Sequence, residues 1–229
     1  MKEYKLYGLI VGLTVTIMIV CDTLVYKVID VYGFKITASG VIFSLSYILS
    51  TISTEVYGYK LGGRTVWIVI LCQSVFVILI NLAVLIPETS PGTIGGHFYS
   101  IYNEFWKVMI GTWISVPASY FCNGYLVSKL KLYFHGKFFI LRYLISSMTA
   151  QAVLLLTAYP ISLSSKYSTY DIENIIFTTW SYKVIISIFL FPLASYLVVI
   201  IKNIEKTDYY DWGTNYNPFS VFRGENVKK

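Results

Sequence analysis

The chain has 229 residues, of which 56% are hydrophobic and 13% are charged, and its formal net charge is +6. Soluble domains carry about 25% charged residues, so a surface that faces water throughout is not expected here. The composition also excludes an intrinsically disordered chain, a coiled coil and a small disulfide-rich scaffold. It indicates a polytopic membrane protein, which requires that the apolar residues form runs of membrane length.

The apolar residues do form such runs. A helix needs about 20 mostly apolar residues to cross a hydrocarbon core about 30 Å thick, and the runs lack the alternating period of an outer-membrane barrel. The first run is too long for the core of a signal peptide, and no cleavage site of small residues follows it, so we expect it to be a span. The fourth is the weakest, because Trp113, Ser115 and Pro117 dilute it. We predict an all-α polytopic membrane protein with six transmembrane helices, at Leu6–Tyr26, Ile36–Val56, Val66–Ile86, Lys107–Val127, Phe138–Ala158 and Trp180–Ile201.

The loops between the runs predict the orientation of the chain. Cytoplasmic loops of membrane proteins carry an excess of Lys and Arg. Twelve of these residues lie on the side of the two termini and five on the opposite side. We therefore expect a protein of the cell (inner) membrane with both termini in the cytoplasm, divided into a transmembrane domain (1–206) and a short cytoplasmic tail (207–229). The positive charge follows from this topology, and no patch of basic and aromatic residues suggests a nucleic-acid partner.

Cysteine and histidine give no sign of a metal site or a nucleophile. Cys21, Cys72 and Cys122 fall in predicted spans, where free thiols behave as small apolar side chains. The two histidines, His97 and His135, are isolated and fall in predicted loops. Neither HExxH nor GxSxG occurs, so we expect no catalytic residues, no bound metal, no cofactor and no enzyme activity.

Two glycine patterns have a structural interpretation. The segment Gly58–Thr65 is close to the phosphate-binding GxxxxGK[ST] pattern, but Arg64 replaces the lysine and the segment joins two membrane helices. A nucleotide site there is therefore not expected, and the segment is predicted to be a loop. Gly8 and Gly12 form a GxxxG pattern on the first run, which predicts close approach of a neighbouring helix.

Polar side chains inside membrane helices are costly and tend to face a bundle interior or a cavity. Five of the predicted helices carry them at helical spacing, which indicates a central hydrogen-bonding site for a small polar ligand. Stripes of Ser and Thr can also simply pack helices together, whereas Glu55, Arg142 and Gln151 are harder to explain by packing. We expect Glu55 and Arg142 to pair across the bundle as a gate or a brace, and Lys183 to be a further gating or structural charge.

Several segments, in order along the chain, resemble the queuosine precursor transporter family, also called the vitamin uptake transporter family. Thr54-Glu-Val-Tyr-Gly-Tyr-Lys60 looks like the family's TEVYGYK signature, and residues 208–219 are similar to its carboxy-terminal motif. Weaker matches lie on the fifth predicted helix around Arg142 and Gln151, and on the sixth at residues 182–187. The resemblance extends from about residue 36 to residue 219.

This resemblance implies a transporter that imports a deazapurine precursor of the tRNA base queuosine: 7-cyano-7-deazaguanine, its aminomethyl relative or queuine. It also implies a six-helix fold similar to the substrate-binding components of energy-coupling-factor transporters. The family usually has aspartates where this chain has Thr51 and Leu154. A separate energy-coupling ATPase module is a candidate partner that would supply the energy. The alternatives are a transporter of another small polar heterocycle or vitamin, and a non-transporting membrane scaffold.

A flat deazapurine requires an aromatic platform and side chains that both donate and accept hydrogen bonds. We expect Trp67 or Trp180 to stack on the ring. The polar residues predicted to bind it lie on the second, fourth and fifth helices and are Ser50, Thr51, Ser119, Asn123 and Gln151. The tail is predicted to dock at the cytoplasmic end of the bundle through Trp212, Tyr216 and Phe219.

Overall fold

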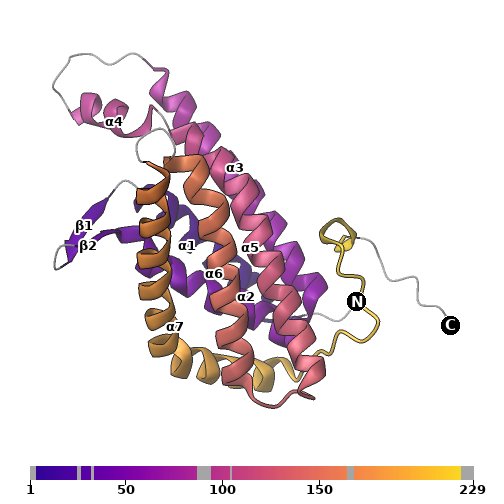
Figure 1. The fold of residues 1–229 in the computed structure, drawn as a ribbon. Helices are drawn as coiled ribbons and strands as arrows, with labels where there is room; N and C mark the ends of the chain where they lie inside the picture. The colour runs from indigo at the N-terminus through magenta and orange to yellow at the C-terminus, as the bar shows by residue number, and fades with distance from the viewer. Residues whose placement is uncertain are drawn as a thin grey trace.

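The computed structural model of the protein describes residues 4–24, 27–31, 34–86, 94–103, 105–163 and 168–222. Long helices lie side by side in a bundle, with a short β-hairpin and a small helix at one end, here called the hairpin end, and the described tail after α7 toward the other, here called the tail end (Figure 1). Within the described residues the elements are α1 (Tyr7–Leu24), β1 (Val28–Val31), β2 (Phe34–Thr37), α2 (Ala38–Tyr57), α3 (Tyr59–Val84), α4 (Ile94–Tyr102), α5 (Phe105–Tyr133), α6 (Phe139–Leu163), α7 (Thr169–Glu205) and the 3-10 helix η1 (Pro218–Ser220).

Five helices in the described part of the chain are long and apolar enough to cross a membrane: α1, α2, α3, α6 and α7. The fourth predicted span lies on α5, which is not among them. This helix nevertheless has 29 residues, about 43 Å at 1.5 Å per residue, and packs against both α3 and α6 (Figure 1). The all-α polytopic class is therefore confirmed, and the sixth span stays a prediction.

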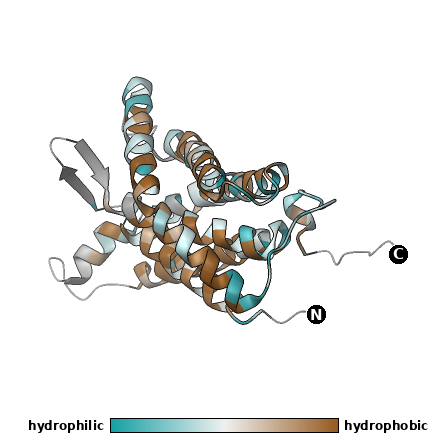
Figure 2. Ribbon diagram, turned by 90° about the horizontal axis from the view of Figure 1, so that it is seen from below, coloured by the Kyte–Doolittle hydropathy of each residue, from teal (hydrophilic) through white to brown (hydrophobic). Residues whose placement is uncertain are grey.

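The outer faces of the bundle are apolar. Large side chains such as Leu79 and Phe189 are exposed there, as expected for helices that face lipid. The helices are largely hydrophobic in Figure 2, and much of the hydrophilic colour lies on the tail. α2 is the central helix, because it packs against α1, α3, α5, α6 and α7 and most of its length is buried. Its polar residues are consequently interior ones.

Several predicted boundaries were wrong. α3 begins at Tyr59, directly after Gly58, so the predicted loop of residues 57–65 is mostly the first turns of a helix. α7 begins at Thr169, well before Trp180. The Ser168 hydroxyl caps this start by accepting a hydrogen bond from the Asp171 amide at 3.2 Å. In both cases polar residues interrupt the added turns, so a search for apolar runs misses them.

The hairpin end was not predicted. β1 and β2 pair in antiparallel register with Val31 opposite Phe34, and α4 contains His97, which was expected in a loop. Among the described residues the close helix contact expected at Gly8 and Gly12 is also absent, because a Cβ placed at either position meets nothing within 4 Å there. These two glycines lie on an exposed face of α1.

The corner between α2 and α3 depends on Gly58. This residue has φ of +86°, a conformation that side-chain-bearing residues rarely adopt, and a Cβ there would collide with the Tyr209 ring of the tail. We expect Gly58→Ala to lower the free energy of unfolding by about 1–3 kcal/mol. The measurement is thermal unfolding of the detergent-purified protein, with Gly12→Ala as the matched control. An unfolding midpoint for Gly58→Ala equal to that of the control would contradict the requirement for glycine.

The first and last long helices are joined at the tail end by one carboxylate. Glu205, the last residue of α7, accepts hydrogen bonds from the Lys5 and Leu6 amides at 3.2 and 2.6 Å. The Tyr57 hydroxyl at the end of α2 donates to the same side chain at 3.0 Å. The amides at the start of α1 lack helical partners, so Glu205 supplies acceptors that α1 cannot provide itself.

Candidate functional site

A buried ion cluster lies at the tail end of the bundle. The Glu55 side chain on α2 is 0% exposed and accepts two hydrogen bonds from the Arg142 guanidinium of α6, one of them at 3.2 Å. The Lys202 ammonium of α7 donates to it at 2.8 Å, and that of Lys131 lies 3.5 Å away. The predicted pairing of Glu55 with Arg142 is thus confirmed, whereas its role as a gate stays a prediction.

The tail completes this cluster. The Asp208 carboxylate accepts hydrogen bonds from Lys131 and Lys202 at 2.5 and 2.8 Å, so the two lysines are shared between Glu55 and the tail. Burial acts to raise the pKa of Asp208, but the two lysines hold the pKa below its usual value. Its contribution to stability is therefore present above the ordinary pKa and is lost as the pH falls through the lowered one. The side chain is 44% exposed, so solvent screening keeps that contribution small.

The described part of the tail docks against the bundle, as predicted. The buried Asp211 carboxylate accepts the Tyr59 amide at 3.0 and 3.1 Å, capping the start of α3, and burial raises the pKa of this carboxyl. The Tyr59 hydroxyl donates to the Tyr216 carbonyl at 2.8 Å. Of the three aromatic anchors predicted, Tyr216 packs on Tyr59, and Phe219 touches Trp67 with its ring centroid 5.4 Å away. Trp212 is 69% exposed, and its docking at the cytoplasmic interface stays a prediction.

The central site contains an amide held by two hydroxyls. The Asn123 side chain on α5 is 0% exposed, and its NH2 group donates to Ser50 and Thr51 of α2 at 3.1 and 3.3 Å. Its carbonyl oxygen finds no donor among the described residues. Because the NH2 group is held, the direction of that oxygen is fixed.

A second amide follows the same pattern. The Gln151 side chain on α6 is 0% exposed and its NH2 group donates to Ser187 of α7 at 2.9 Å, while its Oε1 atom finds no donor among the described residues. The Ser119 hydroxyl of α5 donates to the backbone carbonyl of Ala150, the residue before Gln151 on α6, at 2.7 Å. The five polar residues predicted from the sequence are therefore distributed over adjoining buried contacts of α2, α5, α6 and α7.

Two tyrosines that were not predicted from the sequence also lie at this site. Tyr47 of α2 and Tyr120 of α5 stack with ring centroids 5.2 Å apart and an interplanar angle of 22°. The Tyr47 hydroxyl bonds to Ser119, and that of Tyr120 donates to Ser46. Both residues lie within apolar runs, where an aromatic ring is the usual core residue and carries no separate signal. Their position next to Ser119 and Asn123, one turn apart on α5, could be inferred only from helical spacing.

The remaining predicted residues lie elsewhere. The Trp67 indole donates to the Pro218 carbonyl of the tail at 3.0 Å, and its ring contacts Phe121 and Phe219. The Trp180 indole donates to the Met148 carbonyl at 3.0 Å. The Lys183 ammonium lies 4.7 Å above the centre of the Phe43 ring and is apart from the Glu55 cluster. The structure thus gives each tryptophan a protein partner, and their stacking on a ligand stays a prediction.

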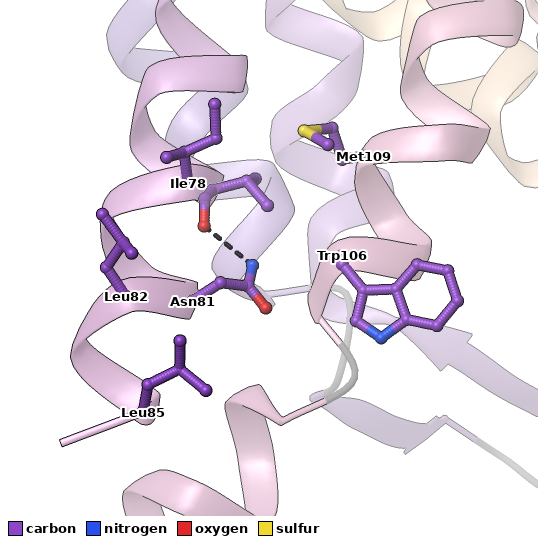
Figure 3. A pocket seen from close by; sticks show the side chains of 7 residues that line it. Ile78, Asn81, Leu82, Leu85, Trp106 and Met109 are labelled. Atoms are coloured by element: carbon purple, nitrogen blue, oxygen red, sulfur yellow. Dashed lines mark hydrogen bonds between the residues drawn. The ribbon is translucent and has the colours of Figure 1, made fainter.

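A surface hollow of about 290 Å³ opens between the last turns of α3 and the start of α5 (Figure 3). Its wall is almost entirely apolar, and the NH2 group of Asn81 is turned back to the Val77 carbonyl at 2.8 Å. Such a surface offers little to orient a small polar ligand. The lining residues are Val77, Ile78, Asn81, Leu82, Leu85, Trp106 and Met109.

Within the described residues, no group of three or more His, Cys, Asp or Glu side chains is placed to hold a metal ion. Comparison with curated proteins gives no match, and comparison with solved structures gives none either. A family model described as "Putative vitamin uptake transporter" matches residues 37–198, which include the central site, Glu55 and Arg142. That match covers most of the chain, and the chain belongs to the vitamin uptake transporter family.

Proposed function

We propose that this protein imports a deazapurine precursor of queuosine through the membrane. The resemblance of residues 54–60 and 208–219 to the queuosine precursor transporters supports this choice within the family. The observation that carries it is a pair of fully buried amide oxygens, on Asn123 and Gln151, that find no donor among the described residues. Leaving such an acceptor unpaired costs about 1–3 kcal/mol, so a ligand that donates N–H groups is favoured.

A deazapurine has the chemistry that this site requires. It is flat and carries a pyrrole N–H, a ring N–H and an exocyclic amine, each able to donate to an amide oxygen. The aromatic rings of Tyr47 and Tyr120 offer faces on which such a ring can stack. The NH2 groups of both amides donate to hydroxyls, that of Asn123 to Ser50 and Thr51 and that of Gln151 to Ser187. These hydrogen bonds fix the direction of the two acceptor oxygens before the ligand binds.

We assign to the tail end of the bundle the role of closing the central site on its cytoplasmic side. Glu55, Arg142 and the docked tail join α2, α6, α7 and the α2–α3 corner on one side of the central site. We assign this side to the cytoplasm, with both termini there, because most Lys and Arg residues of the loops lie on it. Transport then requires the cluster to open or the site to be reached from the opposite side.

The proposed site predicts a defect on removal of one amide. Gln151→Leu removes the fixed acceptor while preserving side-chain bulk, so uptake should fall about 5- to 100-fold. The measurement is the queuosine content of tRNA in a strain that cannot make the base, fed each of the three precursors in turn. Thr149→Val, on the exposed face of the same helix, is the matched control, since the Thr149 hydroxyl bonds only to its own helix in the described structure.

Two outcomes would contradict these assignments separately. Unchanged queuosine in the double variant Gln151→Leu with Asn123→Leu would reject the site. Absence of queuosine with the intact protein, despite good membrane expression and all three precursors tried, would reject the deazapurine substrate. Another small heterocycle or vitamin would then be the cargo, or the protein would be a membrane scaffold, which pull-down of its partners would reveal. Copurification of an ATPase would identify the energy source.

A further inference from the structure

One face of α1 near the hairpin end carries three buried side chains that reach three different helices. The Tyr120 hydroxyl of α5 lies 3.2 Å from the Met18 sulfur, and the Cys21 thiol lies 3.8 Å from the Ser39 carbonyl of α2. Gln73 of α3 donates its NH2 group to the Asp22 carboxylate at 2.7 Å. Because positions 18, 21 and 22 share a face of the helix, the Asp22 carboxylate lies inside the bundle, where it is 8% exposed.

A buried cation approaches the same place from α7. Lys183 is 4% exposed, its ammonium lies 4.7 Å above the Phe43 ring, and it is close enough to Cys21 to interact electrostatically with that thiol. Phe43 in turn packs on Tyr47 and Tyr120, with ring centroids 5.6 and 6.4 Å away. In the described part of the chain the Lys183 ammonium has no ion pair or hydrogen bond, which is expensive for a charge inside a membrane protein.

Gln73 supplies an independent sign that this place holds a ligand. Its side chain is 2% exposed, and while its NH2 group is used by Asp22, its Oε1 atom finds no donor in the described residues. The carboxylate and the amide oxygen of this pair adjoin Cys21 on α1, and the Lys183 ammonium lies over the Phe43 ring and within electrostatic range of that thiol. Two acceptors and one donor match a ligand edge that carries N–H groups beside a carbonyl oxygen.

We propose that Asp22, Gln73 and Lys183 form the subsite that recognises the amide-like edge of the imported heterocycle. The ring N–H and exocyclic amine donate to Asp22 and Gln73, and the ring carbonyl oxygen accepts from Lys183. This assignment rests on the proposed import of a deazapurine. It specifies which edge of the ligand hydrogen-bonds to which group of residues. Lys183 stands one turn, about 6 Å, from Ser187 on α7, so the subsite adjoins Gln151, which takes the pyrrole edge.

The test measures binding of two ligands to the purified full-length protein by isothermal titration. 7-Cyano-7-deazaguanine has the carbonyl oxygen, and its 6-thio analogue replaces that oxygen with sulfur, a weaker acceptor, while keeping the ring N–H. The unchanged protein should bind the first about 5- to 100-fold more tightly, because the buried ammonium pairs poorly with sulfur. Lys183→Met should remove this preference, and Lys183→Gln, which keeps a donor, should restore part of it.

Asp22→Asn should weaken binding of both ligands by a similar factor, because it keeps the shape of the side chain but replaces one acceptor oxygen with a donor. Thr14→Val is the matched control on α1, since the Thr14 hydroxyl is buried and bonds only to its own helix in the described structure. Thermal unfolding of each variant checks folding. Should a variant not fold, the preference of the unchanged protein between the two ligands still decides.

Three results would overturn the subsite. Equal affinity of the unchanged protein for the two ligands would do so, as would an undiminished preference in Lys183→Met or wild-type affinity in Asp22→Asn. If Gln151→Leu still weakens binding in those cases, the proposed function stands and only the subsite fails. Absence of deazapurine binding by the unchanged protein would overturn both.

Discussion

A Glu55→Gln variant should lose about 3–5 kcal/mol of unfolding free energy, the largest stability effect expected for this protein. Glu55 is the carboxylate that Arg142, Lys131 and Lys202 share inside the bundle. Arg142 is 1% exposed, and without Glu55 its remaining partners in the described structure are the Lys137 and Gly136 carbonyls, both at 3.0 Å. The unfolding midpoint of the detergent-purified variant should therefore fall by roughly 6–20 °C.

Two further variants make this expectation specific. Glu173→Gln removes an exposed carboxylate on α7 and should change the unfolding free energy by no more than about 0.5 kcal/mol. Arg142→Gln added to Glu55→Gln should cost less than the two single changes together, because the second change removes the cation that the first leaves unpaired. Strictly additive losses, or a wild-type midpoint for Glu55→Gln, would show that the two side chains are not coupled.

The second large effect is expected at the tail. Asp211→Leu leaves the buried Tyr59 amide without its acceptor, which costs about 1–3 kcal/mol. Since Asp211 joins the tail to the first turn of α3, that loss raises the open population of the tail about 5- to 100-fold. Trypsin cleavage after Lys206, an exposed residue at the end of α7, should become faster by the same factor.

The exposed ring of Trp212 provides the control for this experiment. Trp212→Ala lies next to the same residue but removes a side chain that is 69% exposed, so the cleavage rate should stay within about twofold of that of the unchanged protein. Uptake measured in parallel tests whether the docked tail is needed for transport. Cleavage of Asp211→Leu at the unchanged rate would mean that the remaining contacts, such as that between Trp67 and Pro218, hold the tail alone.

The sequence predicts the long helices well because lipid imposes length and hydropathy on them. It predicts their ends poorly: polar residues interrupt the first turns of α3 and α7, which are capped by Asp211 and by Ser168 and do not depend on lipid. β1 and α4 lie outside the apolar runs and carry no membrane signal, and β2 takes the first two residues of the predicted second span, Ile36 and Thr37. Apolar runs of membrane length thus identify the long helices, but they cannot identify polar helix ends or elements outside the membrane.

In the candidate site, the sequence identifies residues whose type is rare inside a membrane. It misses residues that matter only because of the neighbours they meet in the folded structure. Glu55, Arg142 and Gln151 are conspicuous because polar groups in lipid are costly. Asp22 falls near the end of the first predicted span, where a charge can also reach the interface, so its burial against Gln73 had no sequence signal. Lys131 was counted as a loop charge that sets topology, and its contact with Glu55 depends on how α2 and α5 pack.

The hydrogen bonds that Glu205 accepts from Lys5 and Leu6 bear on the order in which the molecule is made. α1 precedes the other long helices in the described chain, so the acceptor for its first amides emerges from the ribosome only after those helices have been made. Until then the amides at the start of α1 must rely on water at the membrane surface. Because the start of α1 and the end of α7 meet at Glu205, the helical domain is suited to circular permutation. A chain in which a linker leads from the docked tail back to α1, with new ends cut elsewhere, should keep both this contact and the tail contacts.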